Sequence, residues 1–291
     1  MQKIMILTDT GCDLDKETLT ELGIKALPFT LTIGDITFRE TFDKTTQEIY
    51  ELMGKIDQIP KTAQITPQEF KDVYQEAYEQ GYTDIISVSI CSGGSGTYNN
   101  SILAKNDFYE ENPEAESKMN IYNLDSKCYT TFYGYPITEA VKKINKGVSA
   151  KEICAYLQEW FDSAAVYAVP YNLKYAKKSG RISAAKAFAG EMLGLKPIIE
   201  FADGTTNTIE KVRGEKNIIP KLMEIVEKKM TPQTPYVIIH GRDNTLALEL
   251  EKEMVKKYGR KPEMTNPIGA VVAANIGPDV VAILIRRKNI K

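Results

Sequence analysis

The fold is decided by the stretch Ile85-Ile86-Ser87-Val88-Ser89-Ile90-Cys91-Ser92-Gly93-Gly94-Ser95-Gly96-Thr97-Tyr98. The run from Ile85 to Ile90 carries no glycine, proline or charge, which is typical of a central strand covered on both faces. Hydroxyls and glycines follow at its carboxyl end, where ligands bind in an open α/β sheet. The stretch therefore predicts a buried strand that runs into a binding loop.

The composition of this loop narrows the kind of ligand. Its glycines can take positive φ and let a bound group approach the main chain, while Ser92, Ser95 and Thr97 offer short hydroxyls. A helix can begin near Thr97 with Ser95 as its N-cap, so free N–H groups would face the same space. Such a pocket suits a carboxylate or a phosphate. A tight strand-to-helix turn built from small residues is the alternative interpretation.

Motifs of several enzyme classes are missing from the chain. It contains no G-x-x-x-x-G-K-[ST], and its loop lacks the G-x-G-x-x-G order, which argues against a nucleotide-binding regulator. A nucleophile elbow also fails, because Ser95 has Gly93 before it but Thr97 after it. His240 is the only histidine, so few bases are available for a triad. We predict no catalytic residues, with a serine hydrolase acting through Ser92 or Ser95 as the alternative.

Composition excludes several further classes. The formal net charge is −2 and 43% of the residues are hydrophobic, so nothing indicates a nucleic-acid partner. The four cysteines are widely spaced and form no C-x-x-C, and a multi-histidine site is ruled out, so we predict no metal. No apolar run of about eighteen residues appears, and the N-terminal run reaches Asp9 early. These features predict a cytoplasmic protein.

The first half of the chain alternates strands with helices. Strands are expected at 4–7 and 119–124, each followed by polar residues, and alternation of this kind favours a parallel sheet. Capping boxes start helices at Thr66 and Ser149. Asp13 is expected to cap a helix over 14–22, and an acidic metal site on Asp9 and Asp13 is the competing idea.

The second half begins near residue 164. A strand is expected at 166–170, a hairpin around Asp203-Gly204, and further strands at 236–239, 269–274 and 280–285. Arg181 precedes an apolar helix predicted over 182–195, where a lone cation needs a carboxylate partner from the protein or from a ligand. We therefore predict an α/β protein with two domains, 1–163 and 164–291.

Five segments resemble the motifs of the DegV family, in the same order. Ile90–Tyr98 resembles I-S-S-x-x-S-G-T-Y, and 8–14 resembles T-D-S-x-x-D-L. The segment 60–70 resembles P-x-T-S-Q-P-S-x-x-E-F, 173–183 resembles L-x-Y-L-x-K-G-G-R-I-S, and 268–279 resembles I-G-x-V-I-x-x-H-x-G-P-G. Asn275 replaces the histidine of the last motif, and further departures include Thr10, Ala63, Thr66, Ala176, Ser179 and Asp279.

The resemblance implies an N-terminal domain with a parallel sheet and helices on both faces, and a mixed α/β C-terminal domain. Between them a long-chain fatty acid would bind, with no further cofactor. The protein would present its carboxylate to an ATP-dependent fatty acid kinase subunit for acyl-phosphate formation in bacterial phospholipid synthesis, with transient membrane contact as a further expectation. A pure lipid carrier without kinase coupling is the alternative. Fatty-acid-binding positions would be Thr62, Ser92, Gly93, Arg181 and Asn275.

Arg213 lies in a basic segment that resembles a stretch of the family facing the kinase. Arg213 could therefore dock the kinase subunit electrostatically, or it could be an ordinary exposed charge at a helix start.

Overall fold

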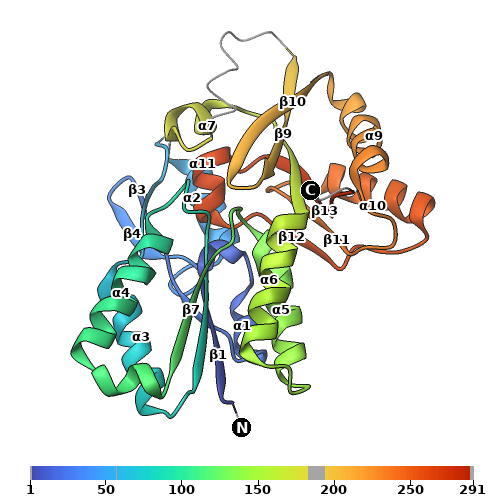
Figure 1. The fold of residues 1–291 in the computed structure, drawn as a ribbon. Helices are drawn as coiled ribbons and strands as arrows, with labels where there is room; N and C mark the ends of the chain where they lie inside the picture. Colours follow the sequence, from blue (N-terminus) through green and yellow to red (C-terminus); the bar gives the residue numbers. More distant parts are fainter. Residues whose placement is uncertain (1, 57, 183–193, 289–291) are drawn as a thin grey trace.

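Two larger sheets and a small one organise the protein (Figure 1), whose computed structural model describes residues 2–56, 58–182 and 194–288. The N-terminal sheet is entirely parallel and has the order β2-β1-β6-β7. Its strands are β1 (Ile4–Asp9), β2 (Lys25–Leu27), β6 (Asp84–Ser89) and β7 (Asn120–Asp125). All residues of β6 are buried between β1 and β7, which confirms the predicted central strand.

Helices cover both faces of the N-terminal sheet. α3 (Pro67–Glu79) and α4 (Thr97–Glu111) pack on one side, and α5 (Thr131–Ile144) and α6 (Ala150–Ser163) on the other (Figure 1). Both predicted capping boxes are present, at the starts of α3 and α6. The short helical turns η1 (Thr10–Cys12) and η2 (Pro113–Ser117) follow β1 and α4. This arrangement confirms the predicted fold class for the first half.

Two predicted caps are wrong. Helix α1 (Lys16–Glu21) is capped by Asp15, whose carboxylate accepts from the N–H of Thr18 at 2.7 Å. Asp13 instead adopts a left-handed φ of 58° and closes η1. The N-cap of α4 is Gly96, and the Ser95 hydroxyl only accepts a long bond, 3.3 Å, from the N–H of Thr97. In both cases several short polar residues compete for one helix start, and spacing does not select among them.

A small antiparallel sheet, β4-β3-β5, lies beside the parallel one. β3 (Thr30–Ile33) and β4 (Ile36–Arg39) form a hairpin, α2 (Thr46–Lys55) follows, and β5 (Lys61–Ala63) returns along β3. Thr62 pairs with the fully buried Leu31, which holds Thr62 in an ordered position.

The C-terminal sheet is mixed and has the order β10-β9-β8-β13-β11-β12. Its strands are β8 (Ala164–Pro170), β9 (Leu195–Ala202), β10 (Thr205–Arg213), β11 (Tyr236–His240), β12 (Met264–Pro267) and β13 (Val280–Arg286). Asp203 and Gly204 both have positive φ, as a two-residue hairpin requires, so the predicted β9–β10 turn is confirmed. The segments η3 (Glu215–Asn217), α9 (Ile218–Lys229) and α10 (Thr245–Tyr258) follow or lie between these strands.

Successive residues of β8 face two different cores. Ala165, Tyr167 and Val169 pack in the apolar cluster that includes α9 and α10. Val166 and Ala168 face the other way, into the larger cluster that continues through the N-terminal half. The C-terminal sheet is therefore buried on both faces, and its inner face looks toward the loop after β6.

The strand predicted at 269–274 is wrong, because this segment forms helix α11 (Ala270–Ile276). Nearly every residue of α11 is buried, so the segment shows no amphipathic period that would distinguish a helix from a buried strand. Gly269 is its N-cap and Gly277, with φ 104°, ends it. Helix α7 (Lys174–Ser179) packs against α11. The helix predicted over 182–195 falls mainly on 183–193, outside the described residues.

Candidate functional site

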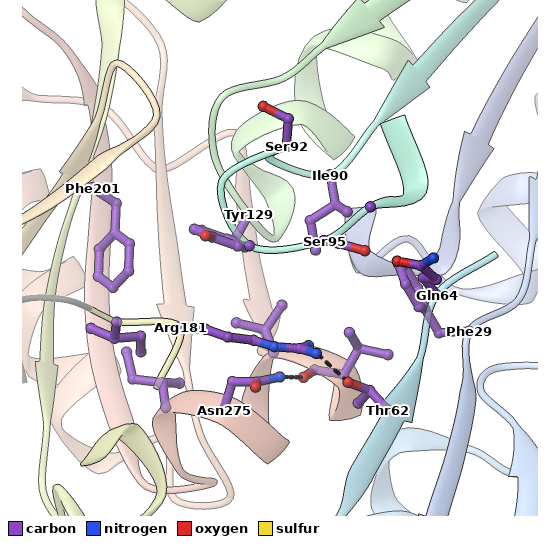
Figure 2. Close-up of a pocket in the computed structure, with 16 residues that line it drawn as sticks. Phe29, Thr62, Gln64, Ile90, Ser92, Ser95, Tyr129, Arg181, Phe201 and Asn275 are labelled. Atoms are coloured by element: carbon purple, nitrogen blue, oxygen red, sulfur yellow. Dashed lines mark hydrogen bonds between the residues drawn. The ribbon is translucent and has the colours of Figure 1, made fainter. Parts of the chain in front are cut away.

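A cavity of about 500 Å³ opens between the loop after β6, strand β5, helix α11 and the segment after α7. It lies at the carboxyl end of β6, as expected for an open α/β sheet. Figure 2 shows side chains from both halves of the chain that point into this space. Much of the wall is apolar or aromatic: Phe29, Ile90, Tyr129, Ile182, Phe201, Val271, Val272 and Ile276.

The polar end of the cavity joins the two halves of the chain. The guanidinium of Arg181 donates to the Thr62 hydroxyl at 2.9 Å (Figure 2). No carboxylate among the described residues forms a salt bridge with Arg181. Of the two partners predicted for this cation, a protein carboxylate is therefore not found among these residues. A permanently charged group without an anionic partner at a cavity wall suits an anionic ligand.

Ser92 lines the cavity, but its hydroxyl points away from Arg181 and Thr62 (Figure 2). This hydroxyl donates to Asp125 at 2.5 Å, and the Ser92 N–H donates to the same carboxylate at 3.1 Å. Asp125 also accepts the N–H of Lys127 at 2.8 Å. Asp125 therefore ties the loop after β6 to the end of β7, and Ser92 shapes this loop.

The loop glycines allow close approach of neighbouring groups. A Cβ on Gly93 would lie 3.3 Å from the carbonyl oxygen of Gly204, so Gly93 accommodates the β9–β10 turn. Gly93 is not part of the cavity wall. A Cβ on Gly94 would lie 2.5 Å from the Tyr129 hydroxyl, and one on Gly96 would lie 2.3 Å from Oε1 of Gln64. A side chain at either position would displace the end of Tyr129 or of Gln64 from its present place.

Gln64, Ser95 and Tyr129 line the cavity although the site prediction omits them. Gln64 and Ser95 lie inside two of the motifs quoted above, so the resemblance already pointed to both as possible site residues. Tyr129 follows β7 by four residues in a segment without a strong pattern, and its role depends on tertiary packing. Burial raises the pKa of the Tyr129 hydroxyl, so it stays protonated and can donate a hydrogen bond.

Asn275 contributes to the wall from helix α11. Its side-chain amide donates to the carbonyl of Val271 at 2.7 Å, one turn earlier in the same helix. The main-chain carbonyl oxygen of Asn275 accepts a hydrogen bond from the Ser179 hydroxyl at 3.3 Å, and this bond links α11 to α7. Asn275 thus lies beside Arg181 with its amide N–H already paired within the helix (Figure 2).

Arg213 is not among the residues that line this cavity; it lies at the end of β10 and is exposed. It pairs with Leu195 in the hairpin, and its carbonyl accepts from Asn217 at 2.8 Å.

Asp9 organises the strand ends beneath the cavity. Its buried carboxylate accepts from the N–H of Ile90 at 2.8 Å, from the N–H of Gly11 at 3.1 Å and from the Tyr133 hydroxyl at 2.6 Å. Burial raises the pKa of Asp9 to about 6. Among the described residues no group of three or more acidic, cysteine or histidine side chains could hold a metal ion. The Asp9 carboxylate is thus engaged by three donors, one of which is the Gly11 N–H at the start of η1.

A second, smaller chamber of about 30 Å³, the inner chamber, adjoins the cavity. Tyr129, Phe201, Val272 and Ile276 belong to the walls of both spaces. The inner chamber is lined almost entirely by apolar atoms of β8, β13 and α11. The site therefore has a polar end near Arg181 and apolar walls on the side of the inner chamber.

Known proteins resemble this chain over nearly its whole length. Residues 3–288 match the family model described as "Uncharacterised protein, DegV family". A DegV domain-containing protein from Clostridium acetobutylicum is 30% identical over 98% of this chain and 99% of its own length. The chain belongs to the DegV family.

Solved structures share the whole fold. A stearic-acid-binding protein from Eubacterium ventriosum is 26% identical, with a TM-score of 0.85 and 98% of both chains covered. A fatty-acid-binding DegV family protein from Streptococcus agalactiae is 27% identical, also with a TM-score of 0.85, over 99% of this chain and 100% of the other. None of the helices in the described part of this chain is long and apolar enough to cross a membrane.

Proposed function

We propose that this protein binds one long-chain fatty acid, with its carboxylate at Arg181 and Thr62 and its chain directed toward the inner chamber. The observation that carries this proposal is one cavity with a guanidinium and a hydroxyl at one end and apolar walls leading inward. Each buried CH₂ contributes about 0.8 kcal/mol, whereas one hydrogen bond contributes about 1 kcal/mol. The apolar chain therefore supplies most of the affinity, and the polar groups orient the acid.

The polar groups act in different ways in this proposal. Arg181 and Thr62 contact the carboxylate directly, and Asn275 lies beside them in the wall. Ser92 and Gly93 shape the loop, because the Ser92 hydroxyl is bonded to Asp125. The ligand would lie between two domains, 1–163 and 164–291, since α6 ends at Ser163 and β8 begins the second sheet at Ala164.

Mass spectrometry tests the proposal. Protein purified under native conditions is expected to carry about one long-chain fatty acid per chain, which denaturing extraction releases. After extraction, the protein should rebind the acid and show neither esterase nor ATPase activity. A stoichiometric nucleotide without lipid would contradict the proposal.

A serine hydrolase finds little support in the site. Ser92 donates to Asp125, and the Ser95 hydroxyl pairs with that of Thr97 at 2.9 Å. His240 lies at the end of β11 with its Nδ1 at 2.7 Å from the carbonyl of Gly241. Neither serine has a histidine as its hydrogen-bond partner, which supports a lipid-binding subunit without its own catalytic centre.

We further propose that the cytoplasmic protein presents the bound carboxylate to an ATP-dependent kinase subunit for acyl-phosphate formation. Asn275 occupies the position of the histidine in the motif. A neutral amide stabilises the negative charge that develops during acyl-phosphate formation less than an imidazolium does. Asn275→His is expected to raise acyl-phosphate formation at least several-fold in an assay with a supplied kinase subunit, at unchanged lipid affinity. An unchanged or lower rate would show that asparagine is a functional equivalent.

The same assay examines Arg213 as part of the docking surface. Arg213→Glu should slow turnover without altering lipid affinity, because the residue is exposed and lies outside the cavity wall. If turnover is unchanged, Arg213 is an ordinary surface charge.

A further inference from the structure

Tyr129 lies at the boundary between the outer cavity of about 500 Å³ and the inner chamber. Its side chain lines both spaces, together with Phe201, Val272 and Ile276, and a residue that lines two adjoining spaces lies between them. The other three residues belong to the buried core, whereas Tyr129 is only partly buried and packs against that core. Tyr129 is therefore the member of this boundary that can be changed with the least effect on the core.

Three neighbours hold the ring of Tyr129 in place. Phe201 packs edge-on against it, with the ring centroids 5.9 Å apart and an angle of 84° between the ring planes. The end of the ring lies on the main chain of Gly94, where a Cβ would come within 2.5 Å of the hydroxyl. The hydroxyl also contacts the Cys91 thiol. A ring packed on these sides presents a fixed surface to a ligand in the cavity.

The main chain around Tyr129 adopts an uncommon conformation. Lys127 has a φ of 58° and Thr130 a φ of 64°, values that are uncommon for residues other than glycine. The carbonyl oxygen of Lys127 accepts from the N–H of Gly204 at 3.0 Å, and the N–H of Thr130 donates to the carbonyl oxygen of Gly11 at 3.0 Å. Backbone strain of this kind is concentrated at functional sites. Here the strained turn directs an aromatic ring into the cavity wall.

A fixed ring in an apolar wall limits how much of an acyl chain the site can bury. Each further CH₂ that enters the cavity tightens binding about fourfold. An acid therefore gains affinity with length until its terminal methyl group meets the wall. A longer acid must leave methylenes in water or displace packed side chains, and overpacking of this kind is unfavourable.

We infer that Tyr129 determines the chain length of the fatty acid that this protein prefers, because its ring limits the space that the acyl chain can fill. The inference rests on the proposed fatty-acid binding and adds a specificity-determining residue to it. Removing the ring should join the outer cavity to the inner chamber, since the surrounding residues relax only partly when a large side chain is lost. Apolar space opened in this way accepts an apolar ligand.

Affinity measured as a function of chain length tests the inference. Lipid-free protein is loaded with a fluorescent fatty-acid probe, which saturated acids of increasing length, from lauric to behenic acid, then displace. The wild type is expected to show an optimum length, beyond which affinity falls. In Tyr129→Ala the optimum should move to a longer acid. An acid about two carbons longer than the wild-type optimum should bind the variant about tenfold more tightly than it binds the wild type.

Two control variants separate the ring from other effects. Tyr129→Phe keeps the ring and removes only the hydroxyl, so it should keep the wild-type optimum. Tyr258→Ala removes the same side chain from α10, where it is half-buried and lies in the wall of neither space, and it should also keep the optimum. If Tyr129→Ala does not fold, Tyr129→Leu replaces it and should move the optimum in the same direction by a smaller amount.

The outcomes separate this inference from the proposed function. The same optimum in the wild type and in the truncated variant would overturn the inference, while tight binding of any long-chain acid would still support the proposed function. An equal shift in Tyr129→Phe and Tyr129→Ala would also overturn it, because the ring would then not be the cause. Failure of every acid to bind the wild type would overturn both.

Discussion

Val272→Phe is expected to weaken binding of a long-chain fatty acid by at least about a hundredfold. Val272 lines both the outer cavity and the inner chamber, so a phenyl ring there would take up space that the acyl chain needs. If five methylenes can no longer be buried in the two spaces together, about 4 kcal/mol of transfer free energy is lost, which is roughly a thousandfold in affinity. Isothermal titration with palmitic acid and with octanoic acid measures the effect, and the shorter acid should lose far less.

Leu103→Phe is the control for this substitution. Leu103 lies on α4 and is 52% exposed, so a larger ring there should change neither acid's affinity. Overpacking at Val272 should also lower stability by about 1–3 kcal/mol, which a melting curve records independently. An equal loss for both acids would mean that the chain does not pass Val272.

The second large effect concerns a buried carboxyl that holds helix α11. Glu40 is 1% exposed and follows β4, and its Oε1 accepts the N–H of Val271 at 2.9 Å. Its Oε2 has no partner among the described residues, and neither carboxylate oxygen of Asp13 has one. Burial raises the pKa of Glu40 to about 7, and burial together with the Glu40 charge raises the pKa of Asp13.

A folded-state pKa above the ordinary value means that the native state binds the proton more tightly. The stability contributed by Glu40 is then fully present below about pH 4.5 and is lost as pH rises to about 7. That shift corresponds to about 3 kcal/mol of unfolding free energy. Glu40→Gln keeps an acceptor for Val271 but does not titrate. We expect the variant to be more stable than the wild type at pH 8 and to lose less stability between pH 4.5 and 8.

Urea unfolding at several pH values measures this difference. Some slope should remain in the variant, because burial also raises the pKa of Asp9 to about 6. Glu110→Gln on the exposed surface of α4 is the control and should follow the wild-type curve. Parallel curves for Glu40→Gln and the wild type would show that Glu40 ionises normally in the folded protein.

Elements with strong local signals could be predicted from the sequence. Strand β6 has a long uncharged run, and α3 and α6 begin at complete capping boxes. The polar residues at strand ends could be placed together because parallel strands share one carboxyl edge. Thr62, Arg181 and Asn275 come from distant segments, and their predicted proximity rested on motif resemblance.

The remaining features depend on tertiary context. Helix α11 is buried all round, so its sequence carries no period that separates it from a strand. Ser92 lies in the predicted loop, but the direction of its hydroxyl is set by Asp125, which lies 33 residues away. Tyr129 becomes part of the site only through the packing of β9 and α11 around it.

The hydrogen bond between Arg181 and Thr62 has a consequence for how other molecules would recognise this protein. In the empty state the mouth of the cavity displays an uncompensated guanidinium, since no carboxylate of the described residues pairs with it. A bound fatty acid would bring one negative charge to the same place and neutralise it. Empty and loaded protein would then differ by one unit of charge at one spot on the surface. A partner with an acidic patch would favour the empty form and leave the loaded form free to diffuse.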